Sequence, residues 1–119
     1  MKERGIGKNR FGNDLLRQYY DEIQQCFLCG QYRGSDFHHN THRHYPEDAS
    51  LLNAVPLCRE CHTNDGAITK LEQQQVFFER VLRHLFSQGY KLQEIDMLYL
   101  RRYSDKFYQI MIKFLNEQQ

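Results

Sequence analysis

The cysteine- and histidine-rich part of the chain reads CFLC at residues 26–29, DFHH at residues 36–39 and NAVPLCRECH at residues 53–62. Two Cys-x-x-Cys pairs bracket two adjacent histidines, and a third histidine directly follows the last cysteine. Four thiols in two such pairs are typical of a tetrahedral Zn²⁺ site. The spacing therefore predicts a structural zinc that folds this segment, with a second group of metal ligands beside it.

The predicted ligands of the structural zinc are Cys26, Cys29, Cys58 and Cys61, which are all the cysteines of the chain. Two disulfides are the alternative interpretation, but disulfides are typical of secreted chains. No apolar run approaches the roughly 18 residues that a membrane span needs, and the first residues are polar and basic, unlike a signal peptide. We therefore expect a cytoplasmic protein with no membrane partner, whose paired cysteines bind metal.

A chain of 119 residues is long enough for one small domain, and a zinc ion would help to stabilise it. We expect a flexible basic arm at residues 1–12, a zinc module with its N-terminal helix at 13–67, and a helical extension packed on the module at 68–119. The formal net charge is only +1, but basic residues gather in the arm and again at 101–113. Both patches could contact phosphates, and solvated surface is the alternative for each.

Hydrophobic periodicity and turn residues predict the order of the elements. We expect a helix from Asn13 or Asp14 to about Gln25, a strand at 36–39, a polar loop at 40–48, a strand at 53–57 and a short helix from Arg59. Gly30 allows the tight turn that a zinc knuckle needs. This order predicts an α+β fold built on a small, treble-clef-like zinc module with flanking helices.

The C-terminal part of the chain has the pattern of helices. One is expected to begin at Thr69 and to stop at Gly89, another to begin near Leu92 and a last one to begin near Ser104. Near Tyr103 the pattern leaves open whether the last two helices are separate or form one bent helix. We expect the tail to pack on the zinc module, and the use of its aromatic stripe for a homodimer or a protein partner is the alternative.

The adjacent histidines carry the candidate chemistry. Because neighbouring side chains on a strand point to opposite faces, His38 and His39 cannot easily bind the same ion. One can face an ion while the other faces a substrate, and His62 lies on the short helix that the zinc ties against the strands. An ion with two protein ligands keeps open positions for water and phosphate oxygens. This arrangement suits phosphodiester hydrolysis, in which a neutral histidine removes a proton from water.

These runs resemble the HNH endonucleases of the ββα-metal (His-Me finger) group, in their four-cysteine zinc subset. The resemblance covers residues 26–66 and implies that His39 is the general base that activates water. It also implies that His38 and His62 hold the catalytic divalent ion, and that Asn53 orients the loop between the strands and the base. The implied substrate is DNA, and the implied ion is Mg²⁺, Mn²⁺, Ni²⁺ or Zn²⁺. Small proteins of this kind are common in phages and mobile elements.

The sequence departs from the family pattern at two positions. Asn40 stands where relatives usually have an apolar residue after the histidine pair, and Ala54 replaces the commoner Leu after the asparagine. Neither change removes a catalytic group, but the first leaves the strand register open. His42 and His44 have no fixed family role and are expected to be exposed loop residues. His84 is expected to be a surface or partly buried helix residue.

The function that the sequence predicts is therefore that of a metal-dependent DNA endonuclease. The alternative is a zinc module that binds nucleic acid or protein without doing chemistry, which would tolerate His39→Ala. A protein that uses its paired cysteines for redox chemistry is a third interpretation and needs accessible thiols of low pKa. Tight stoichiometric zinc would exclude that third interpretation.

Overall fold

The computed structural model describes residues 10–34, 36–41, 43–63 and 70–117. Two small antiparallel sheets pair β1 (Gln24–Gln25) with β2 (Tyr32–Gly34) and β3 (Asp36–His39) with β4 (Ala54–Leu57). The helices are α2 (Asn13–Tyr19), α3 (Arg59–Thr63), α5 (Leu71–Ser87), α6 (Glu94–Arg102) and α7 (Ser104–Glu117). The predicted α+β class, with a small cysteine module and a helical extension, is confirmed.

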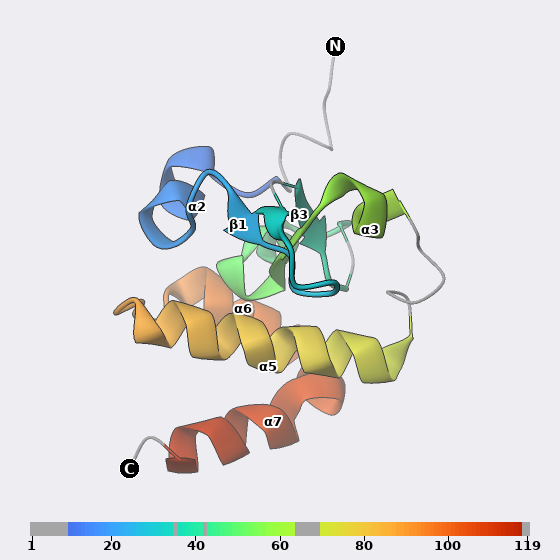
Figure 1. Ribbon diagram of the computed structural model, residues 1–119. Coiled ribbons are helices and arrows are strands. Elements are labelled where there is room, and N and C mark those ends of the chain that lie inside the picture. The colour runs from blue at the N-terminus through green and yellow to red at the C-terminus, as the bar shows by residue number, and fades with distance from the viewer. Residues whose placement is uncertain (1–9, 35, 42, 64–69, 118–119) are drawn as a thin grey trace.

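The long helix α5 lies between the module and the last helix. Figure 1 shows the two sheets, α2 and α3 on one side of α5 and α7 on the other side, and α5 contacts both β4 and α7. Residues from both parts of the chain form one apolar core, which includes Leu52, Val55 and Leu57 of the module and Phe78 and Leu82 of α5. The extension therefore covers the buried face of the module.

Helix α2 is shorter than its sequence predicts, because it ends at Tyr19 and not near Gln25. The chain must become extended there, since β1 pairs with β2 to form the knuckle that presents the first cysteine pair. Tyr20 has extended backbone angles (φ −132°, ψ 142°), and its ring is buried in the core. Ile23, which fits the helical spacing, is 66% exposed instead.

The structure determines the register of the β3–β4 hairpin, which Asn40 left open at the level of the sequence. His38 pairs with Val55 and His39 pairs with Ala54. All of β4 is buried while β3 is half-buried, because α5 covers the former. Strand β4 begins at Ala54, one residue later than predicted, because Asn53 ends a short 3₁₀ turn, η2 (Leu51–Asn53). A further 3₁₀ turn, η1 (Pro46–Ala49), lies in the stretch predicted as a polar loop.

Glycine and tyrosine end the remaining elements. Gly30 in the knuckle and Gly89 after α5 both have positive φ (83° and 84°), as their predicted turn and stop positions require. The structure also answers the question at Tyr103: α6 and α7 are separate helices, and Tyr103 lies between them with its ring buried.

Within the described ranges, no helix is both long enough and apolar enough to cross a membrane.

Candidate functional site

The four cysteine sulfurs converge on one point. Each Sγ lies within 4.8 Å of the other three, and the sulfurs of Cys29 and Cys58 are 3.9 Å apart. A tetrahedral zinc with Zn–S bonds of about 2.3 Å holds its sulfurs about 3.8 Å apart, so the spacing fits that ion. The four thiols are free, so the structure does not contain the two disulfides of the alternative interpretation. This cluster of Cys26, Cys29, Cys58 and Cys61 can hold a structural metal ion such as zinc.

Backbone amides prepare the first cysteine pair for a metal. The N–H groups of Leu28 and Cys29 donate to Cys26 Sγ at 3.4 and 3.5 Å. Burial disfavours the Cys26 thiolate, but the hydrogen bonds outweigh burial and lower its pKa to about 6. Burial and the neighbouring thiols raise the pKa of Cys61. Because four thiolates this close repel one another, a bound cation is what lets all four ionise together.

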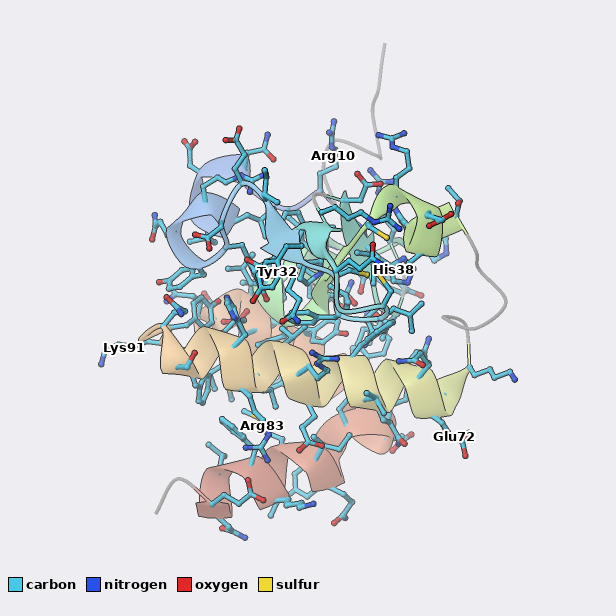
Figure 2. All side chains as sticks on the ribbon, viewed as in Figure 1. Arg10, Tyr32, His38, Glu72, Arg83 and Lys91 are labelled. Atoms are coloured by element: carbon cyan, nitrogen blue, oxygen red, sulfur yellow. The ribbon has the colours of Figure 1, made fainter. Side chains whose placement is uncertain are left out.

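The three predicted histidines line one pocket of about 640 Å³. His38 comes from β3 and His62 from α3, and their ring centroids are 5.3 Å apart at an interplanar angle of 71°. They meet because α3 carries Cys61 as well as His62, and the cysteine cluster ties that helix to the knuckle beside the hairpin. Figure 2 shows His38 on the side of α5 that faces away from α7. The structure thus brings together side chains that are separated by more than twenty residues of sequence.

The environment of His38 keeps its imidazole neutral. Burial is the largest cause, and the nearby His62 and His39 add to it, so that the pKa of His38 falls from 6.5 to about 4. A neutral imidazole has a nitrogen lone pair, which is the form that binds a metal ion. The lowered pKa of His38 therefore leaves this imidazole able to act as a metal ligand at neutral pH.

His39 has different neighbours from His38, as alternation along a strand predicts. Its ring stacks on Phe11, with centroids 4.1 Å apart and an interplanar angle of 18°. Phe11 lies in the stretch predicted as a flexible basic arm, yet it is half-buried and packs against the core. Arg10 and Arg43 also line the pocket and bring positive charge to its rim. The sequence identified neither Phe11 nor Arg43 as part of the site.

Asn53 is completely buried and holds the chain between β3 and β4 in place. Its Oδ1 accepts hydrogen bonds from the Thr41 N–H at 2.9 Å and from the Tyr99 hydroxyl at 2.9 Å. Its Nδ2 donates to the Asp48 carbonyl oxygen at 2.9 Å. These contacts tie the start of the loop, two residues after His39, to its later part.

Asn40, one of the two departures from the pattern of the family that the sequence resembles, is buried and has a partner in the helical extension. Its Nδ2 donates to the Gln74 carbonyl oxygen at 2.8 Å, and Gln74 Nε2 donates back to the Asn40 carbonyl oxygen at 3.0 Å. An apolar residue at position 40 could not donate to Gln74. Only the tertiary structure identifies this pair, because α5 supplies the partner 34 residues away.

Helix α6 adds a second set of buried polar contacts to the same loop. Asp96 accepts from the Ser50 hydroxyl at 2.6 Å and from the Tyr90 hydroxyl at 2.5 Å. Tyr103 donates its hydroxyl hydrogen to Asp48 Oδ1 at 2.8 Å. Buried carboxylates that accept several hydrogen bonds are rigid anchors, so α6 fixes the loop that follows the candidate base.

Asp36 is a further pocket residue that sequence analysis did not assign. Its Oδ2 lies 3.2 Å from His62 Nδ1. A signal for it was present, because Asp36 and His38 are two apart on a strand and therefore share a face. Of the other histidines, His44 is exposed, while His84 is partly buried with its Nε2 2.5 Å from the Tyr19 carbonyl oxygen.

The prediction for His42 lies outside the described residues.

Comparisons of the chain with protein-family models, with curated proteins and with solved structures found no match.

Proposed function

We propose that this chain is a metal-dependent endonuclease of the HNH type that hydrolyses DNA phosphodiester bonds. One observation carries the proposal: His38, His39 and His62 line a single pocket beside a four-cysteine cluster. The order of these residues along the chain is that of the family that the sequence resembles. A non-catalytic zinc module has no need for a pocket with three imidazoles in it.

His39 is the general base of the proposed reaction. Its ring is half-buried and is held on one face by Phe11, so its orientation is restricted. A neutral imidazole fixed in this way can take a proton from a water molecule as that water attacks phosphorus. Asn53 supports this role by anchoring the residues that directly follow His39.

His38 and His62 are the proposed ligands of the catalytic ion, with Mg²⁺, Mn²⁺, Ni²⁺ or Zn²⁺ as candidates. When bound, a divalent ion stabilises negative charge on phosphate oxygens. The low pKa of His38 supports the assignment, because its imidazole is free of the competing proton at neutral pH. His62 is separated from Cys61 by a single peptide bond, so the structural metal restrains its position.

The charge around the pocket supports a nucleic-acid substrate. Arg10 and Arg43 line it together with the histidines. Guanidinium groups bind phosphate oxygens in bidentate fashion, so these side chains are suited to hold the DNA backbone at the pocket. The affinity of the chain for DNA should therefore fall as salt concentration rises.

A plasmid-cleavage assay tests the proposal. The zinc-loaded protein is incubated with supercoiled plasmid and Mg²⁺, Mn²⁺ or Ni²⁺, with EDTA as the metal-free control. We expect nicking or linearisation by the wild-type protein and a rate about 10²–10⁴-fold lower for His39→Ala, since that is the usual contribution of a general base.

The matched control is His44→Ala, which removes a histidine of the loop that follows β3 and that is not among the described residues lining the pocket. This variant should cleave at the wild-type rate. Cleavage that survives His39→Ala unchanged would exclude His39 as the base. DNA binding without cleavage under any of the ions would instead favour the non-catalytic zinc module.

A further inference from the structure

The contact between Asp36 and His62 has no role in the mechanism proposed so far. Asp36 lies at the start of β3 and His62 on α3, and their side chains are 25% and 36% exposed. The Asp36 Oδ2 atom lies 3.2 Å from Nδ1 of the imidazole, within hydrogen-bond distance. The Asp36 carboxylate therefore contacts one specific ring nitrogen, Nδ1, of the proposed metal ligand His62.

A hydrogen bond to one imidazole nitrogen determines what the other can do. Neutral histidine carries one N–H and one lone pair, and a carboxylate beside Nδ1 favours the hydrogen on that atom. The lone pair then lies on Nε2. Histidines that bind metals commonly donate their other N–H to a carboxylate, which fixes the ring and makes the ligating nitrogen more basic.

We propose that Asp36 is a positioning residue that holds His62 as the Nδ1–H tautomer, so that His62 binds the catalytic ion through Nε2. The part of this inference that concerns the ion rests on the proposed function. Asp36 acts through His62 and does not itself join the two histidines on the ion. Among the described residues, only the four cysteines form a set of three or more candidate ligand atoms within 4.8 Å of one another.

The first test needs no catalytic ion. Long-range ¹H–¹⁵N spectra of the full zinc-loaded chain at pH 8 report which nitrogen of each neutral histidine carries hydrogen. Wild-type His62 should show the Nδ1–H pattern, and Asp36→Ala should shift it toward Nε2–H, the form that dominates in free histidine. Asp105→Ala, which removes an exposed carboxylate on α7, is the matched control and should leave His62 unchanged.

The second test measures Mn²⁺ binding to the same proteins by the loss of the free-ion electron paramagnetic resonance signal. Asp36→Ala should weaken binding roughly 10–100-fold, the usual effect of removing such a partner. Asp36→Asn keeps an oxygen acceptor for Nδ1–H and should weaken binding less. This variant keeps the test decisive if Asp36→Ala loses its zinc or its fold, which zinc content and thermal unfolding report.

The outcomes separate the two proposals. Wild-type protein that binds no Mn²⁺ above a His38→Ala, His62→Ala double variant would overturn the proposed catalytic ion. Wild-type protein that binds Mn²⁺ while Asp36→Ala binds it equally well would overturn the role of Asp36 alone. An Nε2–H pattern for wild-type His62 would also overturn the role of Asp36, whatever the ion does.

Discussion

At the scale of single residues, the pocket brings together three imidazoles that have different neighbours. His38 is kept neutral by burial and by the two other histidines. His39 is fixed by its stack on Phe11, and His62 by its contact with Asp36. Each histidine thus has a different kind of environment.

The lowered pKa of His38 predicts a pH dependence of stability. Between its ordinary pKa of 6.5 and its folded-state pKa of about 4, the unfolded chain takes up a proton that the folded chain does not. The free energy of unfolding should therefore decrease as pH falls from about 6.5 to 4. Urea unfolding of the zinc-loaded protein at several pH values in this window measures the slope.

His38→Gln is the control for this slope, because glutamine does not titrate. Loss of zinc at low pH affects both proteins alike, so the difference between their slopes isolates His38. The wild-type slope should be the steeper one. Equal slopes would show that burial in the folded state does not lower the pKa of His38.

At the scale of elements, the loop between β3 and β4 is the best-anchored part of the site. Asn40, the first residue of the loop, donates to Gln74 of α5. Later in the loop, Ser50 donates to Asp96 of α6, and Asp48 accepts from Tyr103, directly after α6. Such contacts hold a loop that has only short 3₁₀ turns of its own. Helices of the extension therefore do part of the work of fixing the residues that follow the candidate base.

Asn40→Leu tests this anchoring. Leucine has a similar shape to asparagine, but it removes the hydrogen bond from Asn40 Nδ2 to the Gln74 carbonyl oxygen. That carbonyl lies within α5, so we expect the free energy of unfolding to fall by about 0.5–1.5 kcal/mol, the usual net contribution of one hydrogen bond. Chemical denaturation of the zinc-loaded protein measures the change.

Gln74→Ala is the companion variant, because it removes the reciprocal hydrogen bond from Gln74 Nε2 to the Asn40 backbone carbonyl oxygen. Each side chain donates to the backbone of the other residue, so each variant removes a different hydrogen bond and keeps the acceptor of the other one. An Asn40→Leu protein that unfolds with wild-type stability would show that the bond to the Gln74 carbonyl oxygen does not stabilise the protein.

At the scale of the whole molecule, the zinc module and the helical extension share one core. Five residues of α5 are buried: Phe77, Phe78, Val81, Leu82 and Leu85. Each contributes about 1.5–3 kcal/mol when buried, so together they contribute an amount comparable to the whole net stability of a small domain, about 5–15 kcal/mol. The cysteine cluster alone does not bury the apolar face of β4.

A chain that ends at residue 69 should therefore lose its cooperative fold even when it binds zinc. We expect a thermal melt without a sharp transition and poorly dispersed amide signals in a ¹H–¹⁵N spectrum. Zinc content, measured by mass spectrometry beside the full chain, separates loss of the metal from loss of the core. A dispersed spectrum with a sharp melt would show that the module folds without its extension.

The sequence alone determined the elements whose signals are local. Ligand spacing predicted the four-cysteine cluster, and Gly30 predicted the turn of the knuckle. These predictions depend on residues a few positions apart, whose geometry the backbone restricts. Helix α2 was predicted too long for the same reason, because Ile23 satisfied a helical spacing while the knuckle required extended chain.

Only the tertiary structure decided which distant groups complete the site. Tyr99 reaches Asn53 across 46 residues of sequence, and Gln74 reaches Asn40 across 34. Asp36 contacts His62 because α3, which carries one cysteine of the cluster, packs against β3. A hydrogen bond requires two groups within about 3 Å, and no sequence pattern specifies which distant polar groups will meet when the apolar core closes.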